Sequence, residues 1–350
     1  MAIPPGAIVP GSLPKFRIYV YSPKGRYVLW AEDGNRVTVE QLLKLSEGGY
    51  KQVFVDLNEE FKYEEYLEAN LGGILENEAP SDEQKAAIFS KVSANVVRGA
   101  FETSLGMGAM SRDAIQRTQR MVKNALMFIA ESNSMEALAK MIGHDYRTYE
   151  HATKVLWFTV AFLKENHDVM ESIQSGQGTF DGDQNKGLLE QCGVGALLHD
   201  IGKAFVAQNI LNKKGPLTAI EWEVMKRHPL NGQAMLLDTD IPNFVKKAVL
   251  QHHEDFYGGG YPMGLEGPAI TVLARVLRII DVFDAMTSRR PYKEPVSPMQ
   301  AAQIMIGTPP GDDGENGAGE DKRDQGMRQC FDEKLLRKFI VFLGNVRLNA

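Results

Sequence analysis

The spacing of hydrophobic residues changes along the chain from alternation to helical repeats. Apolar and polar residues alternate in FRIYVYS and GRYVLWAE (16–32), on either side of a Pro-Lys-Gly turn, which predicts a β-hairpin. KQVFVDL predicts another strand, and TVEQLLKLSEGG predicts a helix that Thr38 caps and a glycine ends. Residues 1–15 are rich in Pro and Gly and are expected to be irregular. The segment 1–62 is therefore predicted to form a small α+β module with a regulatory or docking role.

Apolar residues recur with helical spacing after this module. KYEEYLEANLGGIL (62–75) predicts one helix, and the segment 63–140 is expected to be a helical linker or stalk. The segment 141–350 is expected to be all helical, apart from an acidic, Gly-rich stretch at 308–325 that lacks core residues and indicates a mobile loop. The predicted fold class is mainly α, with a small N-terminal α+β module before an all-helical domain.

Composition excludes several classes of protein. Of the 350 residues 43% are hydrophobic and 24% charged, which is typical of a soluble globular protein. The net charge of −6, without a concentrated basic stripe, disfavours nucleic acid as a partner. Cys192 and Cys330 form no CxxC pair, which favours a reducing compartment, and Cys192 is expected to be a buried residue. No apolar segment reaches the roughly 20 residues that span a bilayer, so no membrane contact and a cytoplasmic location are expected.

Histidines and aspartates fall at the ends and on the core stripes of the predicted helices. His199 and Asp200 follow the apolar run GVGALL, and Asp281 lies inside ARVLRIIDVFDAM, where a buried acid needs a partner. Imidazole and carboxylate ligands suit divalent transition metals, and a carboxylate has two oxygens with which to bridge a pair of them. A binuclear site satisfies all the candidate ligands at once, and these are His151, His199, Asp200, His228, His252, His253 and Asp281.

In order along the chain, these residues resemble the HD-GYP subgroup of the HD-domain metal-dependent phosphohydrolases. The GYP residues are Gly260, Tyr261 and Pro262, and LLHDIGK, ILNKKGPLT, EWEVMKRHP and DVFDAMTSRRPYK also match. The resemblance covers about residues 140–345 and implies an HD-type catalytic domain that hydrolyses cyclic di-GMP to pGpG, GMP or both.

The resemblance also implies roles for individual residues. The seven candidate ligands would hold the metals, with Asp200 bridging them as a catalytic residue. Lys203 would be catalytic and would contact the substrate phosphate, and Arg290 and Lys293 would hold the phosphate or guanine. The GYP residues would contact the substrate or signalling proteins.

Phosphodiester hydrolysis agrees with this ligand set on chemical grounds. A hydroxide held between two metals is a strong nucleophile at neutral pH, and the metals also neutralise the nonbridging oxygens. Fe or Mn is the expected metal, with Ni, Co and Zn also compatible with the ligands. A homodimer through the helical stalk is compatible with the sequence.

Two departures from the family pattern bear on function. Arg147 stands where some members have a glutamate that helps to hold a third metal, so two metals are expected. Asp255 and Tyr257 replace the basic residue and the aspartate that usually follow HHE. Two alternatives therefore stay open: a binding module for cyclic di-GMP or a partner protein with little turnover, and an HD phosphohydrolase acting on another nucleotide.

Overall fold

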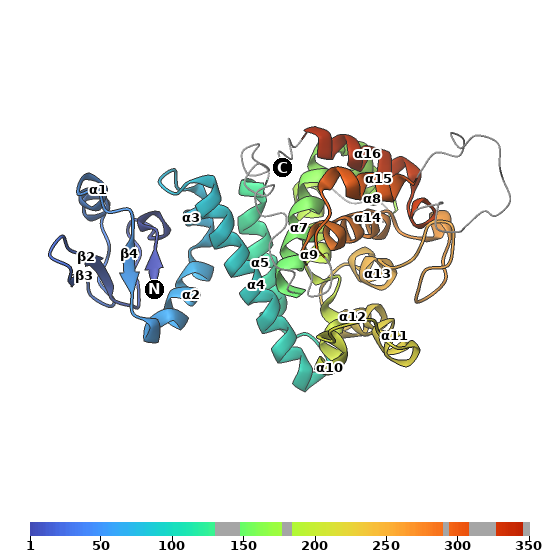
Figure 1. Cartoon of the computed structure of the whole chain (residues 1–350), viewed down its shortest axis with the longest axis horizontal. Helices are drawn as coiled ribbons and strands as arrows, with labels where there is room; N and C mark the ends of the chain where they lie inside the picture. The colour runs from blue at the N-terminus through green and yellow to red at the C-terminus, as the bar shows by residue number, and fades with distance from the viewer. Residues whose placement is uncertain (130–147, 177–183, 290–293, 308–326, 346–350) are drawn as a thin grey trace. The chain divides into compact units, whose positions relative to one another are not determined.

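The computed structural model describes residues 1–129, 148–176, 184–289, 294–307 and 327–345 (Figure 1). The predicted fold class is confirmed: helices predominate, and the described strands form one small sheet near the N-terminus. The chain divides into two compact units. The first comprises Met1–Ser93 and Lys123–Ala137, and the second comprises Ala94–Val122 and Leu138–Ala350. The domain bounds expected from the sequence stay a prediction.

The first unit holds a four-stranded antiparallel sheet of order β1-β4-β2-β3. Its strands are β1 (Ala2–Ile3), β2 (Ile18–Tyr21), β3 (Tyr27–Ala31) and β4 (Val53–Val55). The predicted hairpin is β2 and β3, paired with Tyr21 opposite Tyr27. The expectation of an irregular start is wrong, because Ala2–Ile3 pairs with β4 and Pro5–Ala7 forms the 3-10 helix η1. Two paired residues are too few to show alternation in the sequence.

Short helices follow the strands in the first unit. Helix α1 (Val39–Glu47) begins with the predicted capping box between Thr38 and Gln41. The single helix predicted over 62–75 is wrong in detail, since η2 (Leu57–Glu59), α2 (Glu60–Ala69) and α3 (Leu71–Glu76) follow one another there. Phe16 packs edge-on against Tyr63 and Tyr66, with ring centroids 5.6 and 5.4 Å away.

The other regular elements of the described chain are helices, and no described residue after β4 is in a strand. Ser81 caps the start of α4 by accepting a hydrogen bond from the Gln84 amide. The remaining elements are α4 (Asp82–Met107), α5 (Arg112–Ile129), α7 (Thr148–Glu165), α8 (His167–Ser175), α9 (Gln184–Leu198), η3 (Ile201–Phe205), α10 (Gln208–Leu211), α11 (Ala219–Met225), α12 (His228–Leu236), α13 (Asn243–Gln251), η4 (Gly267–Ala269), α14 (Val272–Thr287), α15 (Pro298–Ile306), η5 (Arg328–Cys330) and α16 (Glu333–Asn345).

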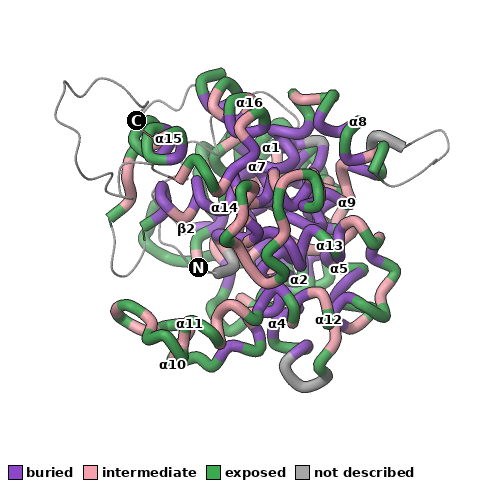
Figure 2. The backbone as a smooth tube through the Cα atoms, turned by 90° about the vertical axis from the view of Figure 1, so that its right-hand side faces the viewer, coloured by how far each residue is buried: buried purple, intermediate pink, exposed green. Residues whose placement is uncertain are grey.

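Helices α7 and α14 form the centre of the second unit, and both run through purple, buried stretches of the tube in Figure 2. Every residue of α7 from 151 to 163 is buried. Phe158 and Phe283 bring the two helices together, and Phe339 of α16 contacts both rings. A helix buried all round holds the polar residues on it in fixed positions, which suits a site built at its first turn.

Among the helices of the described residues, none combines the length and the apolar composition that crossing a lipid bilayer requires. The acidic stretch 308–325, predicted to be a mobile loop, lies outside the described residues, as does Arg147.

Candidate metal centre

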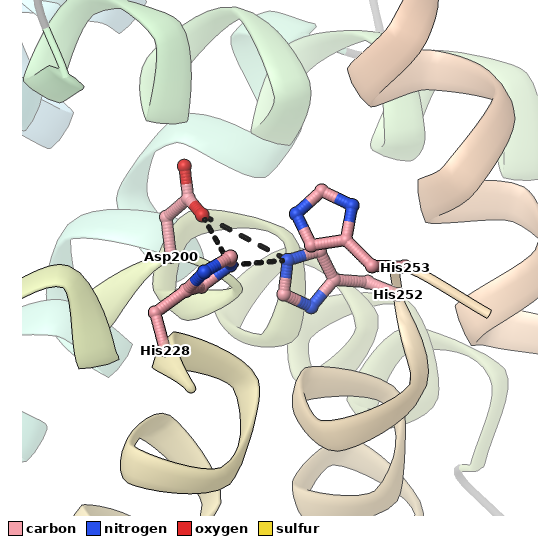
Figure 3. A group of neighbouring side chains, drawn as sticks. All are labelled: Asp200, His228, His252 and His253. Carbon is pink, nitrogen blue, oxygen red and sulfur yellow. Dashed lines mark hydrogen bonds and ion pairs between the residues drawn. The ribbon is translucent and has the colours of Figure 1, made fainter. Parts of the chain in front are cut away.

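The structure brings all seven predicted ligands together. His151 lies in the first turn of α7, His199 and Asp200 follow α9, and His228 is the first residue of α12. The His252–His253 pair follows α13, and Asp281 lies within α14. Figure 3 shows Asp200, His228, His252 and His253 gathered from separate segments of the chain. All are buried except His253, whose side chain is 13% exposed.

The two oxygens of Asp200 face different imidazoles. Its Oδ2 lies 3.4 Å from His199 Nε2 and 3.7 Å from His151 Nε2. Its Oδ1 lies 3.2 Å from His228 Nε2 and 3.7 Å from His252 Nε2 (Figure 3). Asp200 therefore belongs to two groups of closely spaced donor atoms, one with His151 and His199 and the other with His228, His252 and His253.

Asp281 closes the centre from α14. Its Oδ1 lies 3.1 Å from His151 Nε2, and its Oδ2 lies 3.8 Å from His253 Nδ1. The second carboxylate thus reaches a histidine of each group, so the two groups share one continuous site.

Hydrogen bonds on the outer side of the rings fix the tautomers. The Nδ1 atoms of His199, His228 and His252 lie 2.7, 2.8 and 2.7 Å from the carbonyl oxygens of Ala196, Met225 and Val249. A carbonyl oxygen only accepts, so each Nδ1 carries the proton and donates it. In the neutral ring the Nε2 lone pair then points into the site, as metal ligation requires.

Several hydrogen-bond acceptors in the site face one another. This arrangement is unfavourable unless a cation lies between them. His151 and His199 bring their Nε2 atoms to 3.2 Å, and so do His228 and His252. Asp200 Oδ1 is buried and makes no hydrogen bond. Buried acceptors facing one another are stabilised by a shared positive charge, so the donor set fits divalent metal ions.

Charges in the site agree with this assignment. Burial alone would raise the pKa of Asp200, but Lys203 and His199 hold it well below its ordinary value. The pKa of Asp281 is likewise lowered, by His151 and His253 against burial. Burial lowers the pKa of His252 to about 4 and also lowers that of His253. At neutral pH the acids are ionised and these rings neutral, the forms that bind metals.

Asp284 and Lys154 support the centre and were not anticipated from the sequence. Asp284 Oδ2 lies 2.7 Å from His151 Nδ1, and its Oδ1 accepts a hydrogen bond from Ser288 Oγ at 2.9 Å. The ammonium of Lys154 donates to Ser288 Oγ at 2.8 Å. The available signal was the second acid in DVFDAM, because residues three apart on a helix share a face.

A close backbone contact brings His228 to Asp200. A Cβ atom on Gly202 would overlap the carbonyl oxygen of His228 and the amide of Gly232. Only glycine permits η3 and α12 to approach in this way, which explains the glycine that follows the HD pair.

The GYP loop folds against the same histidines. The buried Glu254 accepts hydrogen bonds from the amides of Met263 and Leu265 at 2.6 and 2.9 Å. A Cβ on Gly260 would overlap the Glu254 backbone, so the loop closes on itself there. The Tyr261 ring stacks on His253 with centroids 4.8 Å apart, and the peptide bond between Tyr261 and Pro262 is cis.

The unusual loop residues have structural partners. Asp255 accepts hydrogen bonds from Nε and Nη2 of Arg278 on α14, at 3.0 and 2.7 Å. Another nitrogen of the same guanidinium lies 3.4 Å from His253 Nδ1. Tyr257 is 59% exposed, and its amide donates to the Gln329 carbonyl.

The predicted substrate contacts divide into two sets. Lys203 lies in the site, with its Nζ 2.6 Å from Asp200 Oδ2. Arg290 and Lys293 lie outside the described residues. Cys192 is fully buried as expected, and burial raises the pKa of its thiol.

Comparisons with known proteins agree with the geometry. Residues 173–308 match the family model described as HD domain, a segment that contains six of the seven predicted ligands, all but His151. The chain is 29% identical over 277 residues to cyclic di-GMP phosphodiesterase PA4108 of Pseudomonas aeruginosa, covering 75% of this chain and 62% of that protein. It is 32% identical over 200 residues to a probable cyclic di-GMP phosphodiesterase of Vibrio cholerae, covering 55% of this chain and 41% of the relative.

A solved structure shows the same fold. Bd1817, an HDG"Y"P protein from Bdellovibrio bacteriovorus, aligns with a TM-score of 0.60 at 16% identity, over 98% of this chain and 99% of that one. The chain spans less than two thirds of the curated relatives above, at 62% and 41% of their lengths. Residues 173–308 are thus similar to HD domains, and the chain is similar to curated cyclic di-GMP phosphodiesterases, which confirms the resemblance that its motifs indicate.

Proposed function

We propose that the chain is a metal-dependent phosphodiesterase that hydrolyses cyclic di-GMP to pGpG, GMP or both. One observation carries the proposal: the two oxygens of the buried Asp200 face two separate groups of imidazoles. The names of the relatives, which include cyclic di-GMP phosphodiesterases of two organisms, support the substrate.

The residues present would hold two divalent metals. His151, His199 and Asp281 would hold one, His228, His252 and His253 the other, and Asp200 would bridge them. Fe or Mn fits the mixed imidazole and carboxylate donors best, with Ni, Co and Zn as further candidates. When bound, such a pair supplies Lewis-acid charge and lowers the pKa of a water molecule, which is the nucleophile that phosphodiester cleavage needs.

Lys203 would act on the substrate from beside the metals. The Lys203 ammonium donates a hydrogen bond to one oxygen of Asp200. Because 16% of the Lys203 side chain is exposed, the ammonium can also contact a phosphate. A cation fixed there would add positive charge next to the nonbridging oxygens as they gain negative charge in the transition state.

The assay of products tests the proposal. Protein loaded with Fe(II) or Mn under anaerobic conditions is incubated with cyclic di-GMP, and the products are separated by chromatography. The proposal expects pGpG, GMP or both, and about two metals per chain by elemental analysis. Absence of both products from metal-replete protein would refute the enzymatic function and favour a binding module with little turnover.

Asp200→Ala tests the bridging role with a matched control. Because Asp200 contacts both groups of histidines, its removal should abolish turnover and lower the bound metal from two ions to one or none. Asp168→Ala is the control, since that exposed acid lies on α8 of the same unit and pairs with Lys338. Retained turnover in the Asp200 variant would refute the bridging role.

A further inference from the structure

Three aromatic rings lead from the metal centre to the protein surface. His253, a predicted ligand, stacks on Tyr261 with ring centroids 4.8 Å apart and planes 28° from parallel. Tyr261 in turn meets Trp222 edge-to-face, with centroids 6.1 Å apart and planes 75° apart. His253 and Tyr261 are half-buried, and Trp222 is 45% exposed.

Trp222 is exposed although the segment that carries it is well fixed. It lies on α11, which begins with a capping box between Thr218 and Glu221. Glu221 also forms an ion pair with Lys213 in the preceding loop. The helix is thus held at its start while the indole stays open to solvent, and an edge-to-face contact with Tyr261 leaves a face of the indole free.

Positively charged side chains lie near His253, the ring of the three that belongs to the metal centre. Lys203 is bonded to Asp200 at 2.6 Å, and Arg278 approaches His253 at 3.4 Å. A ligand that carries both a phosphodiester and a flat ring system would find cations at one end and aromatic surface at the other.

We propose that Trp222 and Tyr261 form a stacking subsite for one nucleobase of a nucleotide whose phosphodiester lies at the metal centre. The inference rests on the proposed function for the site of the phosphate and adds the surface that recognises the base. Bases stack on indole and phenol rings whatever their hydrogen-bonding edges, so the subsite binds a purine through its flat face. The base is thereby held while the phosphodiester is presented to Lys203.

Kinetics with two substrates tests the subsite. Trp222→Ala should raise KM for cyclic di-GMP by roughly 5- to 100-fold, the equivalent of one lost stacking contact, with little change in kcat. The same variant should hydrolyse methyl p-nitrophenyl phosphate, a diester without a nucleobase, like the unaltered protein. Trp222→Phe, which keeps a ring, should restore most of the affinity for cyclic di-GMP.

Ile220→Ala is the matched control, because Ile220 is on the same helix and is 80% exposed. It should leave both substrates unaffected. If Trp222→Ala lost kcat/KM equally with both substrates, Trp222 would have a structural role and the subsite would be refuted. An unchanged KM for cyclic di-GMP would also refute the subsite.

A binding measurement separates this inference from the enzymatic proposal. The chain has three tryptophans, so quenching of indole fluorescence by a phosphorothioate analogue of cyclic di-GMP can be compared between the unaltered protein and Trp222→Phe. Quenching that disappears in the variant supports the subsite even if no hydrolysis is found. Quenching of the same size in both proteins refutes the subsite even if hydrolysis is found.

Discussion

Asp284 holds His151 from behind the metal centre: its Oδ2 lies 2.7 Å from the ring Nδ1, and both side chains are buried. Two residues of sequence separate Asp284 from Asp281, whose Oδ1 lies 3.1 Å from the other ring nitrogen of the same histidine. One helix, α14, therefore supplies both a predicted ligand and the group that orients another. Such outer hydrogen bonds fix the tautomer of a ligating histidine and raise its basicity.

Asp284→Ala should weaken metal binding by about 10- to 100-fold, because His151 loses the acceptor that keeps its Nε2 unprotonated. Titration with Mn(II) followed by calorimetry measures the affinity directly, without reference to turnover. Asp284→Asn should retain part of the affinity, since an amide oxygen can still accept the Nδ1 proton. Unaltered affinity in both variants would show that Asp284 does not position the ligand.

Gly202→Ala should destabilise the second unit by about 1–3 kcal/mol, because a Cβ there overlaps the backbone of His228 and Gly232. Urea unfolding followed by circular dichroism measures the free energy. Gly187→Ala is the control: it lies on α9, and a Cβ on it would meet no other atom within 4 Å. That control should be neutral or stabilising by up to about 1 kcal/mol, since alanine favours a helix over glycine. A Gly202→Ala protein as stable as the control would contradict the close approach.

Sequence patterns indicated the candidate ligands because each lies at a helix end or on a core stripe next to a distinctive motif. His199 and Asp200 follow an apolar run, and the order of the motifs along the chain connects them to Asp281. The boundaries of helices were less certain: Asn70 lies between α2 and α3, where the apolar spacing runs on without a break.

Groups defined only by long-range contacts were not predictable from spacing. The ion pair between Asp255 and Arg278 joins a loop to a helix, and neither residue alone indicates its partner. The first strand, Ala2–Ile3, exists because β4 offers it backbone partners, which no local pattern of two residues shows. The ring contact between Trp222 and Tyr261 likewise joins a helix to a loop far along the chain, and no local pattern indicates it.

Asp255→Asn should destabilise the protein by about 3 kcal/mol, because it leaves the guanidinium of Arg278 largely buried without its counter-charge. In an Arg278→Met background the same change should cost much less, since no buried cation remains to be neutralised. Urea unfolding of the unaltered protein, the two single variants and the double variant gives the coupling free energy between Asp255 and Arg278. Additive effects in this cycle would show that the loop acid and the helix base do not depend on each other.

The ion pairs of Glu59 predict how the first unit responds to acid. The Arg17 amide donates to Glu59 Oε2 at 3.1 Å, and Lys62 donates to Oε1 at 3.1 Å. Burial would raise the pKa of Glu59, but the Arg17 amide and Lys62 hold it below the ordinary value of 4.5. A lowered pKa in the folded state contributes stability above the unfolded value, and that contribution is lost as the pH falls through the folded pKa.

Glu59→Gln should therefore reduce the free energy of unfolding at pH 7, and the difference from the unaltered protein should shrink as the pH is lowered below about 4.5, the ordinary value for the carboxyl. Urea unfolding at a series of pH values measures the difference, and carbon NMR of the side-chain carboxyl gives its pKa in the folded protein. Glu47→Gln is the control, because the exposed Glu47 at the end of α1 should give no such pH-dependent difference. A Glu59 carboxyl that titrates at or above its ordinary value, or a difference that stays constant across this range, would show that Arg17 and Lys62 do not stabilise its ionised form.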